Sequence, residues 1–291
     1  MNEFEAFQQA ARIEVDAALE QWVPTPARAG ELAAAMRHIL FAGGKRFRPA
    51  LVLLACEHVG GTRRDALPAA AAVELIHAYS LVHDDLPCMD DALLRRGLPC
   101  AHVVWGEALG VLAGDALQAL AFEVLARHTP PHRPVASMTA ALAEAAGFAG
   151  MVGGQAQDLA GEGQPPDVDR VRRIHAGKTA AMISVSLRLG ALAGGAPAPA
   201  VESLAAAGRD LGLAFQIVDD LLDVQGTTAE LGKTAGSDAA REKLTWPAAV
   251  GVDAALRDAK ELVDSALAQV GEGSGRARFA ALGAYLLPRR S

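Results

Sequence analysis

Residues 78–91 read AYSLVHDDLPCMDD and place four aspartates within eight positions at the end of an apolar stretch. A second stretch, AFQIVDDLLD at residues 214–223, again has an apolar helix-like run that ends in an aspartate pair. Like charges this close repel, and a carboxylate against an apolar wall is costly to keep ionised, so we expect a positive group beside each cluster. Two facing acidic helix segments would form a cage for cations.

The composition favours a helical core around these two stretches. Hydrophobic residues make up 51% of the 291 residues and aromatic residues only 4%, and the apolar part is mostly Ala and Leu, which form helices well. Proline and glycine clusters divide the chain into about ten helix-sized pieces, with almost no strand-like alternation and no repeat of 20 to 50 residues. The predicted fold is all-α, a single-domain antiparallel helix bundle over residues 1–291.

Two segments indicate whether the protein is exported or inserted into a membrane. The first 22 residues carry charged side chains at helical spacing and lack the basic start and apolar run of a signal peptide. We therefore expect a cytoplasmic protein. The apolar stretch from Leu109 to Ala126 is interrupted by Asp115, Gln118 and Glu123, which predicts a buried helix and no membrane span.

Cysteine content and net charge argue against a disulfide-bonded protein, a zinc site and a general nucleic-acid binder. Cys56, Cys88 and Cys100 cannot all pair within one chain and have no zinc-site spacing, so we expect three reduced thiols. The net charge of −7 gives no general attraction to nucleic acid, and no nucleic-acid partner is expected, although a local basic patch can still bind anions.

The spacing of the aspartates suits a hard metal ion. Asp219 and Asp223 are four residues apart and share a helix face, while Pro87 breaks the helix between Asp84 and Asp90 and can turn the later aspartate back toward the earlier one. Oxygen ligands without a Cys or His pattern favour Mg²⁺ over Zn²⁺. The alternatives are two solvated helix ends, or calcium storage, for which the EF-hand loop pattern is missing.

Basic residues between the acidic clusters suit an anion. GGKRFRP, at residues 43–49, is a glycine-opened loop with three cations in four positions, and Arg95 and Arg96 follow the first acidic cluster. Backbone N–H groups and basic side chains together predict a phosphate site. The alternative is an ordinary basic surface loop.

Three further positions fit the same chemistry. His77 lies two helical turns before Asp84 and shares its face, although a lone helix histidine is often only a packing or surface residue. Lys178-Thr179 and Lys233-Thr234 each follow a glycine and offer phosphate contacts. Neither GKT has the upstream glycine of a Walker A motif, so a P-loop is excluded.

The order of these motifs, over about residues 28–250, closely resembles the short-chain trans-isoprenyl diphosphate synthases, and most nearly the bacterial farnesyl diphosphate synthases. The motifs that carry the resemblance are GGKRFRP, HDDLPCMDD with RRG, GGQAQD at 153–158, GKT at 177–179, FQIVDDLLD, and GKTAGSD at 232–238.

The resemblance implies an all-α homodimer with both acidic motifs at the mouth of a deep apolar cavity. It implies that Mg²⁺ is bound by Asp84, Asp90 and Asp219, with support from Asp85, Asp220 and Asp223. The implied isopentenyl diphosphate site contains Gly44, Lys45, Arg48, His77 and Arg96. The implied allylic diphosphate and carbocation site contains Arg95, Lys178, Thr179, Gln216, Lys233 and Lys243.

The implied activity is Mg²⁺-dependent condensation of isopentenyl diphosphate with dimethylallyl or geranyl diphosphate to farnesyl diphosphate. Geranylgeranyl diphosphate synthesis is the alternative. In the family, a bulky residue five positions before the first motif stops chain growth at fifteen carbons; here that residue is Tyr79, although Ser80 shares the face of Asp84 better. A terpene cyclase would have no use for GGKRFRP with His77, and a non-catalytic subunit would be expected to lose an acidic motif.

Some positions depart from the family pattern. Ala92 and Leu93 stand where relatives often carry more acid, and Gln157 replaces a usual apolar residue. Pro288 lies in a tail that differs from the relatives', so closure of the tail over the site is not expected from the resemblance.

Overall fold

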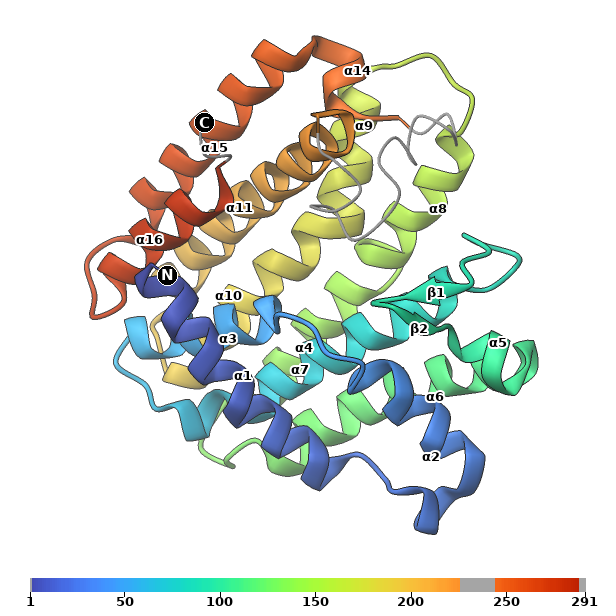
Figure 1. Cartoon of the computed structure of the whole chain (residues 1–291). Coiled ribbons are helices and arrows are strands. Elements are labelled where there is room, and N and C mark those ends of the chain that lie inside the picture. The colour runs from blue at the N-terminus through green and yellow to red at the C-terminus, as the bar shows by residue number, and fades with distance from the viewer. Residues whose placement is uncertain (1, 226–243, 288–291) are drawn as a thin grey trace.

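The computed structural model describes residues 2–225 and 244–287 and is built almost entirely of helices (Figure 1). The α-helices are α1 (Glu3–Trp22), α2 (Pro26–Leu40), α3 (Phe47–His58), α4 (Arg63–Asp84), α5 (Ala101–Trp105), α6 (Glu107–His128), α7 (Val135–Ala146), α8 (Met151–Gly161), α9 (Val168–His175), α10 (Ala181–Gly194), α11 (Ala198–Gln225), α14 (Trp246–Val250), α15 (Val252–Val270) and α16 (Arg276–Leu286). A π-helical turn, η1 (Ala176–Ala180), joins α9 to α10. The all-α prediction is confirmed; the single domain over 1–291 stays a prediction.

Two short strands interrupt the helical pattern. β1 (Leu94–Arg95) and β2 (Leu98–Pro99) form an antiparallel hairpin between α4 and α5. The described helices outnumber the expected ten because short ones, such as α5 and α14, have five residues each. Segments this short do not show a full helical period in the sequence.

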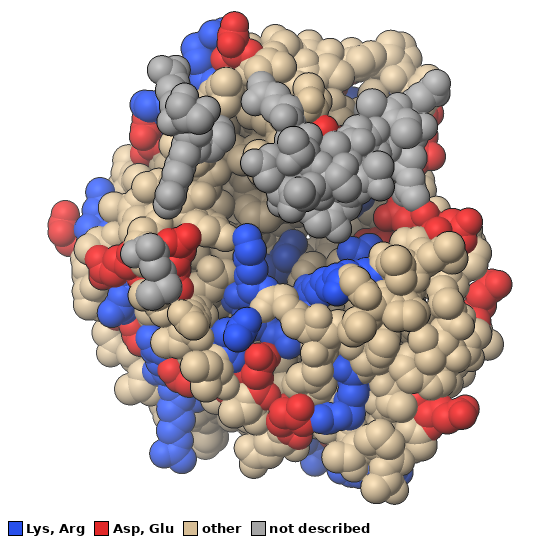
Figure 2. All heavy atoms as spheres, viewed as in Figure 1, with Lys and Arg blue, Asp and Glu red and all other residues tan. Residues whose placement is uncertain are grey.

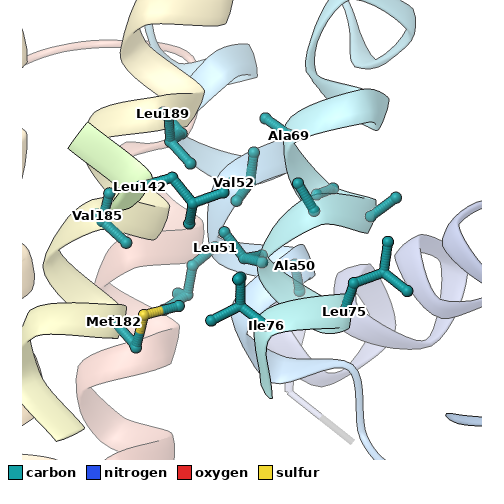
Figure 3. Close-up of a cluster of buried hydrophobic side chains, with 14 of the residues drawn as sticks. Ala50, Leu51, Val52, Ala69, Leu75, Ile76, Leu142, Met182, Val185 and Leu189 are labelled. Carbon is teal, nitrogen blue, oxygen red and sulfur yellow. The ribbon is translucent and has the colours of Figure 1, made fainter. Parts of the chain in front are cut away.

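The central core lies where α3 and α4 face α10, with α7 alongside (Figure 3). Leu51, Ile76 and Met182 are almost fully buried there. α10 approaches α3 so closely that a Cβ at Gly190 would lie 2.2 Å from the carbonyl oxygen of Val52. Glycine at this position is therefore a requirement of the packing. This core supports the acidic end of α4.

A second cluster of buried side chains supports the acidic end of α11. Trp246 of α14 is almost fully buried among residues of α9, α11 and α15, including Ile174, Ile217 and Leu221. Its indole Nε1–H donates to Asp258 at 2.8 Å, so the polar atom of this large side chain is satisfied.

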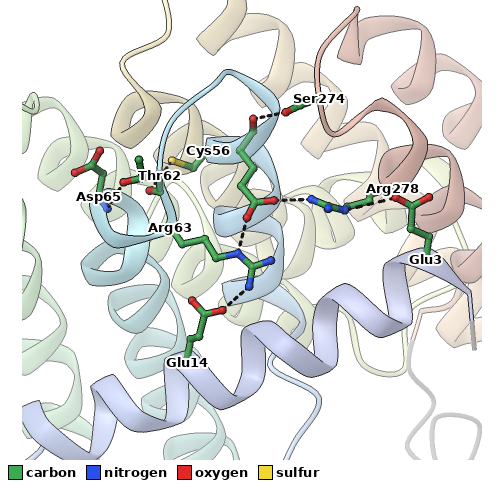
Figure 4. Close-up of polar contacts among 9 residues, drawn as sticks. Glu3, Glu14, Cys56, Thr62, Arg63, Asp65, Ser274 and Arg278 are labelled. Carbon is green, nitrogen blue, oxygen red and sulfur yellow. Dashed lines mark hydrogen bonds and ion pairs between the residues drawn. The ribbon is translucent and has the colours of Figure 1, made fainter.

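A polar network joins the first and last helices to the bundle (Figure 4). Glu57 of α3 accepts from Arg63 and from Arg278 of α16, both at 2.5 Å. Arg63 also binds Glu14 of α1, and Arg278 lies 3.6 Å from Glu3. α1 itself begins with a capping box between Asn2 and Glu5. α1 and α16 thus lie side by side on the bundle (Figure 1).

The expectation that Leu109–Ala126 is a buried helix is wrong in part. The segment forms most of α6, but only 39% of its most apolar window is buried, and Val111 and Leu112 are about half exposed. Its buried face is made by Gly110, Ala113, Leu117 and similar residues that meet α4. By length and composition α6, and the segment Val135–Gly161 that covers α7 and α8, are each long and apolar enough to span a membrane.

The cysteines behave as expected. Cys56 and Cys100 are buried, Cys88 is exposed, and all three are free thiols. Burial raises the pKa of both buried thiols to about 12, so these two remain protonated at neutral pH.

Candidate active site

A cavity of about 970 Å³ lies between the ends of α4 and α11. Residues of α6, α8, α9, η1 and the hairpin complete its wall, so its lining comes from segments far apart in the sequence. Lys and Arg side chains gather around the hollow on the face shown in Figure 2. The cavity lining includes predicted residues from both diphosphate sites and from both acidic motifs.

The first acidic motif folds back on itself at the cavity wall. α4 ends at Asp84, and the N–H of Asp90 donates to the carbonyl of Asp84 at 2.8 Å. This is the reversal expected from Pro87, and both Asp84 and Asp90 line the cavity. The pKa of Asp84 is raised to about 6, chiefly by burial; the charge of Lys178 acts to lower it and that of Asp90 to raise it. A carboxylate in these surroundings is stabilised by a nearby cation.

Asp85 has a different environment. Its side chain is 1% exposed and does not line the cavity. It accepts from Arg95 of β1, with Nε at 2.7 Å and an outer guanidinium nitrogen at 2.6 Å from the same oxygen. Such a forked ion pair fixes orientation as well as charge. Asp85 therefore holds Arg95, and through it the hairpin, at the edge of the cavity.

The second acidic motif lies on the last turns of α11. Asp219 and Asp220 line the cavity, whereas Asp223 is buried outside the lining. Asp220 accepts from His175 Nε2 at 2.9 Å and from the backbone N–H of Trp246 at 2.8 Å. Asp220 thus ties α9, α11 and α14 together beside the site. Sequence reasoning missed His175, which no motif marks.

The π-helical turn places two of the predicted allylic-site residues. The Oγ1–H of Thr179 donates to Oε1 of Gln216 at 2.7 Å, and the Nε2 of Gln216 donates to Asp220 at 3.2 Å. A π-turn inside a helix often marks a functional site. Here it aims Lys178 and Thr179 at the cavity that Gln216 also lines.

Lys178 has a partner that the sequence analysis did not assign. Its Nζ donates to Oδ2 of Asp158 on α8 at 2.6 Å. Burial alone would lower the pKa of Lys178, but Asp158, Asp84 and Asp90 raise it above its ordinary value, so the ammonium is charged at neutral pH. The signal was present, because Asp158 ends the GGQAQD motif, but nothing in the sequence linked it to Lys178.

The basic residues of the loop at 43–49 differ in their surroundings. Arg46 is buried at a left-handed φ of 48° and binds Asp16 and Glu74 at 2.7 Å each and the Leu40 carbonyl at 2.6 Å. The guanidinium of Arg46 is therefore bound to groups of the protein itself. Lys45, Arg46 and Arg48 all line a smaller cavity of about 210 Å³, but only Arg46 is held by this set of protein partners.

The remaining residues of the predicted isopentenyl diphosphate site meet at this smaller cavity. His77 and Arg48 line both cavities, as does Arg96, whose guanidinium donates to the Gly43 carbonyl. At Gly44, φ is 126° and a Cβ would lie 2.8 Å from Arg96, so a side chain there would clash with this guanidinium. Burial lowers the pKa of His77 well below its ordinary value, and the neighbouring guanidiniums lower it further. His77 is therefore neutral at pH 7.

The C-terminal helix reaches this cavity as well. The Nζ of Lys45 lies 3.2 Å from the hydroxyl oxygen of Tyr285 on α16, and Tyr285 lines the smaller cavity. Sequence reasoning did not assign Tyr285 to the site. Pro288, Lys233 and Lys243 lie outside the described residues, so their predicted contributions stay predictions.

The two predicted chain-length residues both line the large cavity. Tyr79 is 5% exposed and Ser80, whose hydroxyl donates to the His77 carbonyl at 2.9 Å, is partly exposed. The Tyr79 ring thus reaches the cavity although its helical position is less favourable than that of Ser80.

The donor set suits metal ions that share their ligands with a substrate. Among residues 2–225 and 244–287, no three Asp, Glu, His or Cys side chains lie close enough to hold a metal ion by themselves. Mg²⁺ usually takes only one or two carboxylates and completes its shell with water and phosphate oxygens. Asp84, Asp90 and Asp219 line one cavity with cationic residues, which fits such shared coordination.

Residues 29–280 match the polyprenyl synthetase family. The chain belongs to this family, and within it to the short-chain trans-isoprenyl diphosphate synthases, so it is a prenyltransferase. It is 47% identical over 275 residues to farnesyl diphosphate synthase of Escherichia coli K12, covering 91% of this chain and 92% of that protein. It is also 47% identical over 266 residues to geranylgeranyl pyrophosphate synthase 12 of Arabidopsis thaliana, covering 88% and 74% of the two proteins.

A solved structure of a relative has the same fold. The geranyltransferase of Helicobacter pylori, complexed with magnesium and isoprenyl diphosphate, superposes with a TM-score of 0.85 at 30% identity and covers 98% of each chain. Relatives of nearly equal similarity thus include synthases of both farnesyl and geranylgeranyl diphosphate.

Proposed function

We propose that this prenyltransferase condenses isopentenyl diphosphate with dimethylallyl or geranyl diphosphate and releases farnesyl diphosphate. The observation that carries the proposal is the ring of Tyr79, which is buried in the wall of the large cavity five residues before Asp84. Five residues correspond to about 7.5 Å along a regular helix. A ring at this depth blocks further extension of a chain whose diphosphate lies at the acidic residues.

The allylic diphosphate is proposed to bind at the large cavity, between the two acidic motifs. Asp84, Asp90 and Asp219 would hold Mg²⁺ there, and the bound ion would supply positive charge to offset the charge on the leaving diphosphate. Lys178 adds a charged ammonium at the same wall, anchored by Asp158, and Arg95 adds a guanidinium anchored by Asp85. Asp85, Asp220 and Asp223 support the site through the protein contacts around it.

The isopentenyl diphosphate is proposed to bind at the smaller cavity. Lys45, Arg48 and Arg96 provide the positive charge, and His77, which is neutral, offers a ring nitrogen between the two cavities. Because His77 and Arg48 line both cavities, a double bond held from this side can reach the allylic carbon.

The reaction then has three steps. The allylic carbon–oxygen bond breaks and the bonding pair leaves with the diphosphate. The π electrons of isopentenyl diphosphate form the new carbon–carbon bond, and the released diphosphate takes the proton that restores the double bond. The hydroxyl of Thr179 and the amide oxygen of Gln216, hydrogen-bonded to each other at 2.7 Å, stabilise the cation as dipoles and are poor nucleophiles. Apolar lining residues such as Leu81, Met89 and Ile174 are proposed to limit access of water to the cation.

Geranylgeranyl diphosphate is the second candidate product. It is favoured by the similarity to plant geranylgeranyl pyrophosphate synthases, which equals the similarity to the bacterial farnesyl diphosphate synthase at 47% identity. The two candidates differ only in where chain growth stops, so the residues at the cavity floor decide between them.

We further propose that the protein is a cytoplasmic homodimer with no nucleic-acid partner and no membrane span. The exposed apolar side chains of α5, α6 and the α7–α8 junction support self-association; they include Val103, Val104, Leu112 and Phe148, which is 92% exposed. Large exposed apolar patches mark contact surfaces. Sedimentation of the purified protein tests the proposed homodimer, because a monomer at micromolar concentration would contradict it.

Product analysis tests the proposed function. The protein is incubated with isopentenyl diphosphate, Mg²⁺ and either dimethylallyl or geranyl diphosphate, and the products are dephosphorylated and separated by chain length. The proposal expects farnesol as the main product from both starters. Mainly geranylgeraniol would establish the second candidate, and no condensation product at all would contradict both.

A further inference from the structure

His83 lies beside the residue proposed to form the cavity floor. It follows Tyr79 by one helical turn on α4, and both rings line the large cavity. The ring centroids are 5.8 Å apart with an interplanar angle of 74°, which is an edge-to-face contact. Such contacts orient the two rings with respect to each other. Whatever fixes His83 therefore also restricts the ring of Tyr79.

α6 fixes His83 from the opposite side. The Nε2–H of His83 donates to the carbonyl of Val111 at 2.9 Å. A Cβ at Gly114 would lie only 2.0 Å from the same nitrogen, so the imidazole occupies the space that the missing side chain leaves. The carboxylate of Asp115 lies 4.0 Å from Nε2. The ring is thus held by a hydrogen bond and by a notch in α6.

We infer that His83 is a positioning residue for product length: its ring, seated in the Gly114 notch of α6, holds the ring of Tyr79 across the cavity as the floor. This inference rests on the proposed function. His83 acts through Tyr79 and need not touch the substrate. Loss of His83, or of the notch that seats it, frees Tyr79 to rotate and lets the chain grow by one more isoprene unit.

The first test measures product length in His83→Ala. Purified variant and wild type are incubated with isopentenyl diphosphate, geranyl diphosphate and Mg²⁺, and the ratio of twenty-carbon to fifteen-carbon product is determined at low conversion. The inference expects this ratio to rise by roughly fivefold, the factor that corresponds to one edge-to-face ring contact. His83→Gln keeps a donor for the Val111 carbonyl but has no ring, and it is expected to raise the ratio too. It decides the matter if His83→Ala does not fold.

Gly114→Ala tests the notch without replacing either of the two ring residues. The added Cβ displaces the imidazole, so the product ratio is expected to rise as in His83→Ala. Gly110→Ala is the matched control, because a Cβ there meets Leu86 at 3.2 Å and no His83 atom among its three nearest contacts. His128→Ala, a histidine of α6 stacked on Trp22, is the second control. Neither control should change product length.

A double-mutant cycle separates positioning from general loosening of the helix. If His83 acts only through Tyr79, Tyr79→Ala with His83→Ala has the same product ratio as Tyr79→Ala alone. Gly114→Ala should likewise add nothing in the His83→Ala background.

Three outcomes overturn the inference. In the first, Tyr79→Ala shifts the product ratio but His83→Ala, His83→Gln and Gly114→Ala do not. This outcome overturns the inference and leaves the proposed function intact. Another is full additivity of His83→Ala and Tyr79→Ala. The third is a wild type that forms no fifteen-carbon product, which overturns the proposed product together with the inference.

Discussion

The ammonium of Lys178 and the carboxylate of Asp158 form an ion pair of 2.6 Å across a helix crossing made by two glycines. A Cβ at Gly154 would lie 2.1 Å from the backbone nitrogen of Lys178, and a Cβ at Gly177 would lie 2.9 Å from the Cα of Gly154. α8 and η1 therefore touch backbone to backbone. This contact places a fixed positive charge opposite the end of α4.

Removal of Lys178 or of its anchor is expected to slow ionisation of the allylic substrate. Lys178→Ala should lower the hydrolysis rate of geranyl diphosphate alone by about a hundredfold, the scale for one preorganised electrostatic group. Asp158→Asn keeps the charge of Lys178 but loosens its position, and a loss of roughly tenfold is expected. A larger loss in Asp158→Asn than in Lys178→Ala would contradict the anchoring role of Asp158.

Substitutions at the smaller cavity should affect the other substrate. Arg48→Ala and His77→Ala are expected to raise the KM for isopentenyl diphosphate by about tenfold or more, with little effect on hydrolysis of geranyl diphosphate alone. Steady-state kinetics with each substrate varied in turn checks this. If Arg48→Ala slows the hydrolysis of geranyl diphosphate as much as Lys178→Ala does, the two sites are assigned wrongly.

The buried ion pairs of Arg46 are expected to stabilise the fold. Arg46→Met leaves Glu74, which is 3% exposed, without its cation and should lower the free energy of unfolding by about 3 kcal/mol. Arg37→Met is the matched control, because its partner Glu20 is half exposed and such pairs contribute about 0 to 1 kcal/mol. Urea unfolding followed by circular dichroism measures both, and equal losses would rule out the buried role.

His77 is expected to make stability depend on pH. Burial and four neighbouring arginines lower its pKa in the folded state well below the ordinary value of 6.5. Below pH 6.5 the unfolded chain binds a proton at this residue that the folded chain does not bind, so stability falls as the pH falls. The slope from this residue is at most about 1.4 kcal/mol per pH unit. Urea unfolding between pH 7.5 and 5.5 should show a smaller loss in His77→Gln than in the wild type, and parallel curves would contradict this.

The helical architecture and the acidic ends of α4 and α11 were predictable from the sequence. Ala-rich helices punctuated by proline and glycine are local patterns, and the reversal after Pro87 follows from one residue. The gathering of basic residues near the acidic motifs was predictable from their order. Local chemistry therefore located most of the charged residues and histidines in the cavity lining.

Contacts between distant segments were not predictable in this way. Nothing local links Lys178 to Asp158, His175 to Asp220, or Lys45 to Tyr285, because these pairs depend on how whole helices pack. Arg46 forms internal ion pairs and has a left-handed backbone conformation. A run of basic residues in the sequence does not indicate this conformation. The exposed face of α6 was missed because an apolar sequence does not distinguish a fully buried helix from one with an exposed apolar face.

The loss of condensation in two acidic variants tests the central claim, that the ends of α4 and α11 form one catalytic centre. Asp84→Ala and Asp219→Ala are assayed separately for farnesyl diphosphate formation from geranyl and isopentenyl diphosphate with Mg²⁺, beside the wild type with and without EDTA. We predict that each variant loses at least about a hundredfold in kcat, and that EDTA abolishes wild-type activity until Mg²⁺ is restored. Near-normal turnover in both variants would contradict the claim.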